Sequence, residues 1–169
     1  THWAVDPVEG GGRIVGEAVH FYDLCCWMLD ADPVAVTADR IDSAGAGGEV
    51  IAEDNLCTLL RFPDGSLATV VYTCLGSPAL PKERIEIAAG GGSVIIDDFT
   101  SVVFAGLPGN TVKKARQDKG QYGQLENFIQ AIRGEAALSI TADHGVRATR
   151  IARQALESAR GGAAPENGA

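Results

Sequence analysis

A series of short segments typical of β-strands runs through the middle of the sequence, and most of the connections between them are short. The segments span residues 34–41, 55–62, 66–75, 83–88, 93–97 and 101–105. Pro63, Asp64 and Gly65, between the second and third segments, are a strong signal for a hairpin turn. Parallel neighbours need crossover connections of a dozen or more residues, so we expect these strands to form an antiparallel meander.

Helical patterns flank this strand-rich region on both sides. One covers residues 14–29 and ends before Pro33; two more lie near the C-terminus, the first of them stopping at Gly134. The apolar stripes are Val15, Ala18, Val19, Tyr22, Cys25, Cys26 and Leu29; Leu125, Phe128, Ile129 and Ile132; and Ala148, Ile151, Ala152, Ala155, Leu156 and Ala159. This order predicts an α+β fold: a mostly antiparallel (mixed) open sheet of about six strands, with helices packed on one face.

Three segments divide the chain. Residues 1–13 are expected to lead into the domain, residues 14–160 to form one α+β domain, and residues 161–169 to be a flexible tail. Hydrophobic residues make up 46% and charged residues 21% of the 169 residues, which is typical of a globular domain. Residue 1 is Thr and the only methionine is Met28. We therefore expect this chain to be a piece of a longer protein.

The net charge and the cysteine content indicate which partners and which cellular compartment to expect. The formal net charge of −8 at pH 7 argues against nonspecific nucleic-acid binding. The sequence holds neither an apolar run long enough for a membrane span nor a signal-peptide pattern, so we expect no membrane partner. The four cysteines lie among apolar neighbours and contain no Cys-x-x-Cys pair, which favours reduced, buried thiols in a cytoplasmic protein: Cys25, Cys26, Cys57 and Cys74.

The first predicted helix carries the most informative residues. Its second face holds Glu17, His20, Phe21, Leu24, Trp27 and Met28, so the helix is apolar nearly all round. Such a helix is normally buried on both sides, and this chain offers few segments to cover the second side. Glu17 and His20, three residues apart, can form a hydrogen bond that orients the imidazole for acid–base work.

Two other interpretations of these residues stay open. His20 can be a structural histidine near a helix N-terminus. Glu17, His20 and Asp23 can also form a metal site, although Asp23 sits to the side of the other two and metal ligands must converge on one point. His144 is expected near the start of the last helix, in a capping position.

Glycine-rich and basic segments are further candidates for ligand sites. The run Gly10–Gly12 precedes a helix but does not follow a strand, and the Gly-x-Gly-x-x-Gly fingerprint of dinucleotide sites is absent. The sequence also lacks a Gly-x-Ser-x-Gly nucleophile elbow. The main basic cluster is a solvated loop or a site for an anionic substrate: Lys113, Lys114, Arg116 and Lys119. Trp3 is expected to pack at a site or an interface.

The segment from Glu9 to Asp23 resembles the start of the C-terminal domain of the Gfo/Idh/MocA oxidoreductases, where a glycine run leads into a helix with a His-x-x-Asp pair. The resemblance covers roughly residues 3–160. It continues through Glu53-Asp54-Asn55, Phe62-Pro-Asp-Gly-Ser66, Pro81-Lys-Glu-Arg84 and Gln117-Asp-Lys-Gly120.

The resemblance implies one half of a two-domain enzyme that acts on sugars, cyclitols or similar small molecules. In this family an N-terminal Rossmann domain binds NAD or NADP and supplies a catalytic lysine. The C-terminal domain supplies substrate contacts, a catalytic histidine and an open sheet face for oligomerisation. We therefore expect no cofactor on this chain alone, a missing Rossmann domain as its partner, and a homodimer formed through the sheet face.

The resemblance also assigns roles to particular residues. His20 matches the catalytic histidine, but the aspartate found four residues earlier in many members is Gly16 here, so Glu17 is the candidate to orient the imidazole. The candidate substrate contacts are Arg13, Asp23, Lys82 and Trp3. The departure at Gly16 supports an alternative function, in which the domain only self-associates or binds ligands within a degenerate oxidoreductase. The isolated chain is expected to be inactive.

Overall fold

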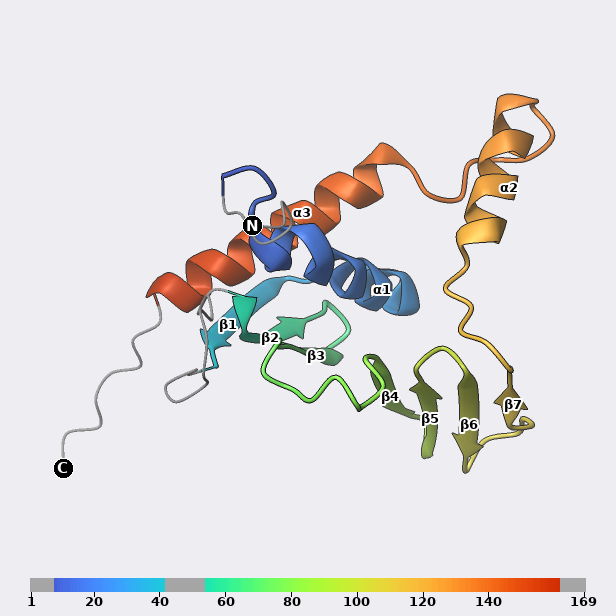
Figure 1. Cartoon of the computed structure of the whole chain (residues 1–169), viewed down its shortest axis with the longest axis horizontal. Coiled ribbons are helices and arrows are strands. Elements are labelled where there is room, and N and C mark those ends of the chain that lie inside the picture. The colour runs from blue at the N-terminus through green and yellow to red at the C-terminus, as the bar shows by residue number, and fades with distance from the viewer. Residues whose placement is uncertain (1–7, 42–53, 162–169) are drawn as a thin grey trace. The chain divides into compact units, whose positions relative to one another are not determined.

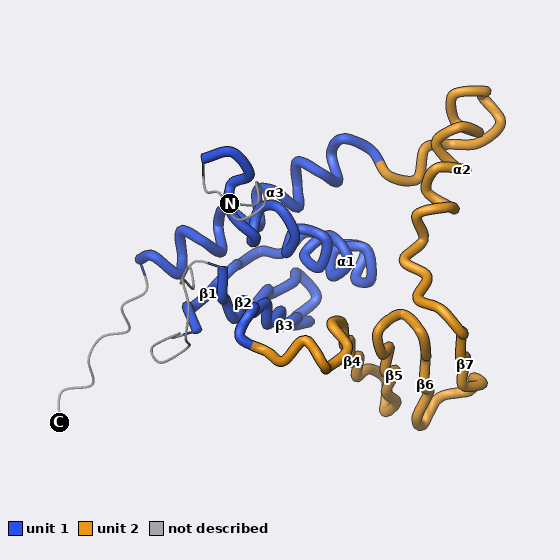
Figure 2. The backbone as a smooth tube through the Cα atoms, viewed as in Figure 1, with its two compact units in different colours: residues 1–75, 141–169 blue, residues 76–140 orange. Residues whose placement is uncertain are grey.

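The computed structural model describes residues 8–41 and 54–161. Two compact units make up the chain: residues 1–75 with 141–169, and residues 76–140 (Figure 2). Trp3, most of the predicted lead-in segment and the predicted tail after residue 161 lie outside the described residues. Each unit has its own sheet.

The first unit is a two-layer structure of helices on a three-stranded sheet. A π-helix, η2 (Ile14–Ala18), continues into α1 (Val19–Leu29), and the unit ends with α3 (Ala142–Gly161). The strands β1 (Ala35–Arg40), β2 (Leu56–Arg61) and β3 (Leu67–Tyr72) pair antiparallel in the order β1-β2-β3. Helices α1 and α3 lie on the same side of this sheet (Figure 1).

Alternation along β2 shows how the sequence builds this core. Leu56, Thr58 and Leu60 are buried, whereas the residues between them face outward. The buried hydrophobic residues come from the helices and the sheet: Ile14, Ala18, Tyr22, Cys26, Ala38, Leu56, Leu60, Phe62, Ile151, Ala152, Ala155 and Ala159. The i, i+4 spacing within the helical members confirms the first and last predicted stripes.

The predicted end of the first helix and the predicted hairpin are confirmed. α1 ends at Leu29, and its cap residue Asp30 adopts a left-handed conformation with φ of 47°. The predicted hairpin turn joins β2 to β3: Phe62 N–H donates to Ser66 O at 2.9 Å, and Gly65 N–H donates to Phe62 O at 3.0 Å. The Asp64 carboxylate accepts from both the backbone and the hydroxyl of Ser66.

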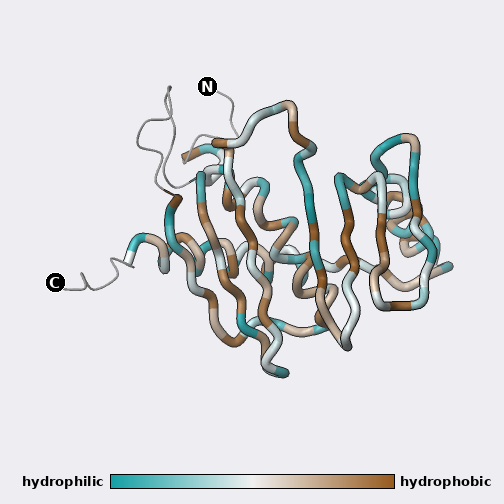
Figure 3. The backbone as a smooth tube through the Cα atoms, turned by 90° about the horizontal axis from the view of Figure 1, so that it is seen from below, coloured by the Kyte–Doolittle hydropathy of each residue, from teal (hydrophilic) through white to brown (hydrophobic). Residues whose placement is uncertain are grey.

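The second unit holds a four-stranded antiparallel sheet and one helix. β4 (Arg84–Ala89), β5 (Gly92–Asp97), β6 (Ser101–Ala105) and the short β7 (Val112–Lys113) pair in chain order. Gly90 and Gly91, with φ of 58° and 80°, form the turn between β4 and β5 that only glycine adopts without strain. α2 (Gln121–Ile132) follows, and none of its residues is buried. Apolar stretches recur along the strands of both sheets (Figure 3).

The α+β class, the open sheets and the antiparallel pairing are confirmed. The division of the strands differs from the prediction: a three-stranded and a four-stranded sheet replace one sheet of about six strands, and β7 is an additional strand. Gly76, Pro78 and Pro81 lie between β3 and β4, and proline cannot donate to a strand ladder, so the meander is interrupted there. Within the described ranges, no helix is both long and apolar enough to cross a membrane.

The four cysteines are all free, but they differ in exposure. Cys26 is buried and Cys25 half-buried, whereas Cys57 and Cys74 are exposed, so the expectation of four buried thiols was wrong for the latter two. Cys57 faces outward because it occupies an alternate position of β2. Burial, with a smaller contribution from neighbouring Cys26, raises the pKa of the Cys25 thiol to about 11.

These exposures predict how the thiols react. Only a thiolate is alkylated readily, so iodoacetamide at neutral pH should modify Cys57 and Cys74 and spare Cys25 and Cys26. On the folded chain, kept monomeric by dilution, mass spectrometry should find two added groups, and after unfolding in denaturant it should find four. Rapid modification of Cys25 or Cys26 in the folded chain would contradict the burial of the first helix.

Candidate functional site

The first helix begins at a backbone position held by a buried carboxylate. Gly12 has a φ of 79°, and a Cβ there would lie 3.4 Å from Asp54 Oδ1. The next residue, Arg13, donates its backbone N–H to the same Oδ1 at 3.0 Å. Arg13 Nε also lies 3.5 Å from Asp54 Oδ2, so the buried charge of Asp54 is paired. The glycine run thus allows a close approach between the helix start and Asp54.

Glu17 lies in an irregular turn. Residues 14–18 form a π-helix instead of the regular α-helix predicted over 14–29. π-Helical turns are rare, and they occur frequently at functional sites. The irregularity therefore adds to the case that this turn has a role beyond packing.

The Glu17 carboxylate accepts a hydrogen bond from a strand of the same unit. Tyr72, the last residue of β3, donates its phenolic hydroxyl to Glu17 Oε2. Burial first, and then the hydrogen bond and charge of Glu17, raise the pKa of Tyr72 well above its usual value, while Arg13 opposes the rise. The phenol therefore stays protonated and acts as a donor to the carboxylate.

His20 lies one turn further along the same helix and is exposed. The hydrogen bond expected between Glu17 and His20 does not form in the part of the chain that the structure describes, where the carboxylate accepts from Tyr72 instead. The π-helical turn at Glu17 changes the i, i+3 geometry of a regular helix, which explains the difference. Glu17 is exposed as well, so both side chains are accessible from the same end of the helix.

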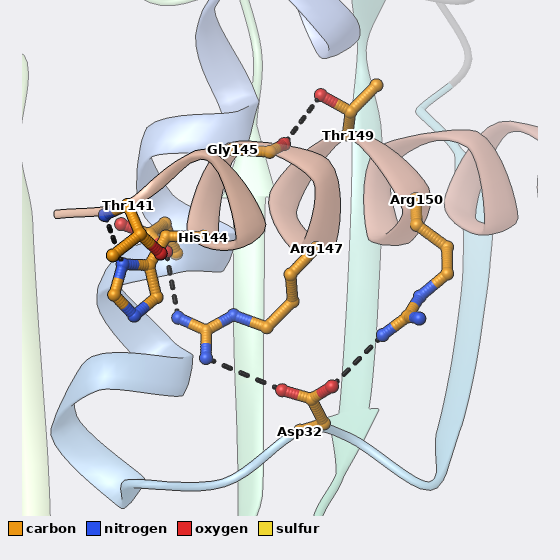
Figure 4. A network of polar contacts seen from close by, with 8 residues as sticks. Asp32, Thr141, His144, Gly145, Arg147, Thr149 and Arg150 are labelled. Carbon is orange, nitrogen blue, oxygen red and sulfur yellow. Dashed lines mark hydrogen bonds and ion pairs between the residues drawn. The ribbon is translucent and has the colours of Figure 1, made fainter.

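Asp23, three residues after His20, makes ion pairs within the unit. Its Oδ1 accepts from Arg147 Nη2 of α3 at 2.9 Å. Arg147 Nη1 also approaches Asp32 Oδ1 at 3.4 Å, and Arg150 Nη2 reaches Asp32 Oδ2 at 3.0 Å (Figure 4). This network joins α3 to α1 and to the segment that follows α1. It gives Asp23 a structural partner where a substrate contact was expected.

The residues of the metal alternative do not converge. Glu17 is engaged by Tyr72 and Asp23 by Arg147. Among the described residues, no group of three histidine, cysteine, aspartate or glutamate side chains lies close enough to hold a metal ion.

The remaining candidates lie elsewhere in the chain. Lys82 belongs to the second unit and is exposed. In that unit Lys114 pairs with Asp118 at 2.6 Å, and Lys119 pairs with Glu83, so two members of the basic cluster already have acidic partners. His144, as predicted, caps the start of α3: its Nδ1 accepts the Thr141 N–H at 3.0 Å.

Sequence reasoning missed two residues of this site. The sequence places Tyr72 in a strand but does not indicate its contact with Glu17, although its alternation with Ala68 and Val70 puts it on the core side of β3. Asp54 belongs to a sequence motif that by itself indicates no role. Asn55 beside it is fully buried and holds the end of β3, since its Oδ1 accepts from Thr73 Oγ1 at 2.8 Å and from Cys74 N–H at 2.9 Å.

The family is established by comparison. Residues 1–165 match the model of the oxidoreductase family C-terminal alpha/beta domain (Gfo/Idh/MocA). The chain therefore belongs to the C-terminal domain of the Gfo/Idh/MocA oxidoreductases. Comparison with curated proteins gives no match.

Solved structures share the fold at low sequence identity. Aldose-aldose oxidoreductase from Caulobacter crescentus, complexed with glycerol, superimposes with a TM-score of 0.76 at 21% identity, over 95% of this chain and 49% of that chain. An inositol dehydrogenase homolog from Azotobacter vinelandii, complexed with NAD+, gives 0.72 at 18%, over 95% and 50%. The WlbA dehydrogenase from Bordetella pertussis, in complex with NADH and UDP-GlcNAcA, gives 0.71 at 19%, over 95% and 49%. The chain thus spans about half the length of these structures.

Proposed function

We propose that this chain is the substrate-binding and oligomerisation half of an NAD- or NADP-dependent oxidoreductase that acts on a sugar, cyclitol or similar compound. A nicotinamide cofactor bound by an N-terminal Rossmann domain would exchange hydride with the substrate carbon. His20 would donate or accept the proton of the substrate oxygen, and Glu17 would orient the imidazole. Alone, the chain would be inactive.

One observation supports this proposal most: the first helix carries an exposed His20 and, three residues before it, the Glu17 carboxylate that accepts a hydrogen bond from Tyr72. Burial already satisfies one face of that helix, yet the other face presents Glu17, His20 and a 73% exposed Trp27. A tryptophan with so large an exposed fraction, on a helix that is apolar nearly all round, indicates that further protein covers this face. Coverage of only about half of each similar structure is consistent with that layer being a second domain.

Arg13 is the strongest of the candidate substrate contacts. It is half-buried, and it lies close enough to the Tyr72 phenol to lower its pKa. A guanidinium here could bind a hydroxyl or an anionic group of a substrate that reaches His20. Asp23, Lys82 and Trp3 remain weaker candidates.

Activity of the intact protein tests the proposal. The protein would be assayed with NAD+ and with NADP+ against inositols, aldoses and nucleotide sugars, following absorbance of the reduced nicotinamide. We expect turnover with at least one of these compounds and none from the isolated chain. Absence of turnover across the panel, with cofactor binding intact, would favour the degenerate, non-catalytic alternative that the departure at Gly16 suggests.

The outer face of the first sheet is the proposed dimer interface. Its apolar residues include Leu59 on β2 and, on β3, Leu67 and Val71, which are 55% and 61% exposed. Register places Cys57 opposite Val71 and Arg61 opposite Leu67, so these side chains share the face away from the helices. Exposed apolar side chains that cluster on one sheet face, here with Arg61 and Thr69 among them, are typical of a protein–protein interface.

If the chain self-associates through this face, a charged side chain introduced on it should weaken the dimer. Val71→Lys should convert a dimer into a monomer, because unpaired lysines would be desolvated at the interface. Analytical ultracentrifugation measures the state, and Val146→Lys on the exposed side of α3 is the control. A wild-type chain that stays monomeric at high concentration, or a Val71→Lys variant that stays dimeric, would contradict the assignment.

A further inference from the structure

The contact between Tyr72 and Glu17 joins two segments 55 residues apart in sequence. An exposed glutamate on a helix normally samples several rotamers, and ordering such a side chain costs conformational entropy. A carboxylate that orients a catalytic group must nevertheless be held in one geometry. Glu17 therefore needs a partner from outside its own helix.

Tyr72 is itself held, so it can serve as that partner. It pairs with Leu56 in the β2–β3 ladder, and its ring packs against the buried core of the unit. Arg13, anchored by Asp54, stands near the phenol and offsets the negative charge of Glu17. The hydroxyl thus comes from a rigid strand, and it reaches an otherwise flexible side chain.

We propose that Tyr72 is a positioning residue that holds Glu17 Oε2 and leaves Oε1 as the acceptor for the imidazole of His20 or for a substrate hydroxyl. Within the described residues, Oε1 accepts no hydrogen bond. The role assigned to Oε1 rests on the proposed function. The hold of Tyr72 on Glu17 is a property of the chain itself and can be measured without a substrate.

Removal of the Tyr72 hydroxyl tests whether it fixes the Glu17 side chain. In Tyr72→Phe the Glu17 side chain should lose its single rotamer, and its three-bond NMR couplings should average, whereas Tyr122→Phe, at an exposed tyrosine, should leave them unchanged. Phenylalanine keeps the packed ring, so the fold should survive. Glu17 couplings that stay unaveraged in Tyr72→Phe would overturn the proposal.

A reciprocal measurement reads the same contact from the phenol. Burial raises the pKa of Tyr72 most, and the hydrogen bond and charge of Glu17 raise it further, so in Glu17→Gln the pKa of Tyr72 should fall while burial keeps it above the ordinary tyrosine value of about 10. Tyrosine ring-carbon NMR would follow the titration, with Tyr22, hydrogen-bonded to Thr58 at 3.0 Å, as internal control. A Tyr72 titration unchanged by Glu17→Gln would overturn the proposal.

The two failures are distinguishable. If His20→Ala leaves turnover intact, the proposed function fails, although Tyr72→Phe should still average the NMR couplings of Glu17. If Tyr72→Phe leaves the NMR couplings of Glu17 unaveraged but His20→Ala is inactive, the proposed function stands and Tyr72 has no positioning role.

Discussion

Replacement of His20 by alanine in the intact protein should lower kcat by roughly 10²–10⁴-fold, the usual contribution of a positioned acid–base group. His20 is exposed and makes no hydrogen bond or ion pair within the described residues, so its loss should leave the free energy of unfolding almost unchanged. Steady-state turnover and denaturant unfolding would be measured on the same preparation. Loss of activity without loss of stability separates a catalytic histidine from a structural one.

Two matched variants sharpen this prediction. His20→Gln keeps a hydrogen-bond donor but cannot transfer a proton at neutral pH, so it should be nearly as inactive as His20→Ala if proton transfer is the role. His144→Ala removes a capping histidine at the start of α3 and should cost stability while leaving kcat near the wild-type value. Near-normal turnover of His20→Ala would refute the catalytic assignment.

The second large effect is expected in the core of the first unit. Leu60→Ala should lower the free energy of unfolding by about 2–5 kcal/mol, because a fully buried leucine loses its packing and leaves a cavity. Leu60 lies between Val36 of β1 and Ala68 of β3, under the two helices. Urea unfolding monitored by circular dichroism measures the change.

Leu59 is the matched control for this variant. It is the neighbouring residue on β2, but it faces the opposite side of the sheet and is exposed. Leu59→Ala should cost less than about 1 kcal/mol in the monomer, since it creates no buried cavity. Equal destabilisation by both variants would show that the two faces of the sheet are not distinguished as the structure has them.

Periodic sequence signals predicted most of the first unit. Apolar spacing located the first and last helices, Pro63-Asp64-Gly65 located the hairpin, and short strand-like runs bounded by turn residues located the strands. These features are local, so they can be read from neighbouring residues. Burial of Ala18, Tyr22 and Cys26 follows from the same stripe.

Contacts between distant residues could not be predicted in this way. Nothing near Glu17 in the sequence indicates Tyr72, and nothing near Asp23 indicates Arg147, which lies 124 residues away. Both pairs depend on how strands and helices stack, and no local pattern encodes that stacking. The division into two sheets was missed for a similar reason: the interruption between β3 and β4 shows in sequence only as scattered Gly and Pro residues.

A crystal structure of the intact protein with bound NAD+ or NADP+ tests the central claim most directly. We expect the nicotinamide ring to lie against the face of the first helix that carries Glu17, His20 and Trp27, with room for a substrate between the ring and the His20 imidazole. Such a structure would also show the Rossmann domain covering Trp27. A nicotinamide bound away from this face, with His20 still open to solvent, would contradict the catalytic role of His20.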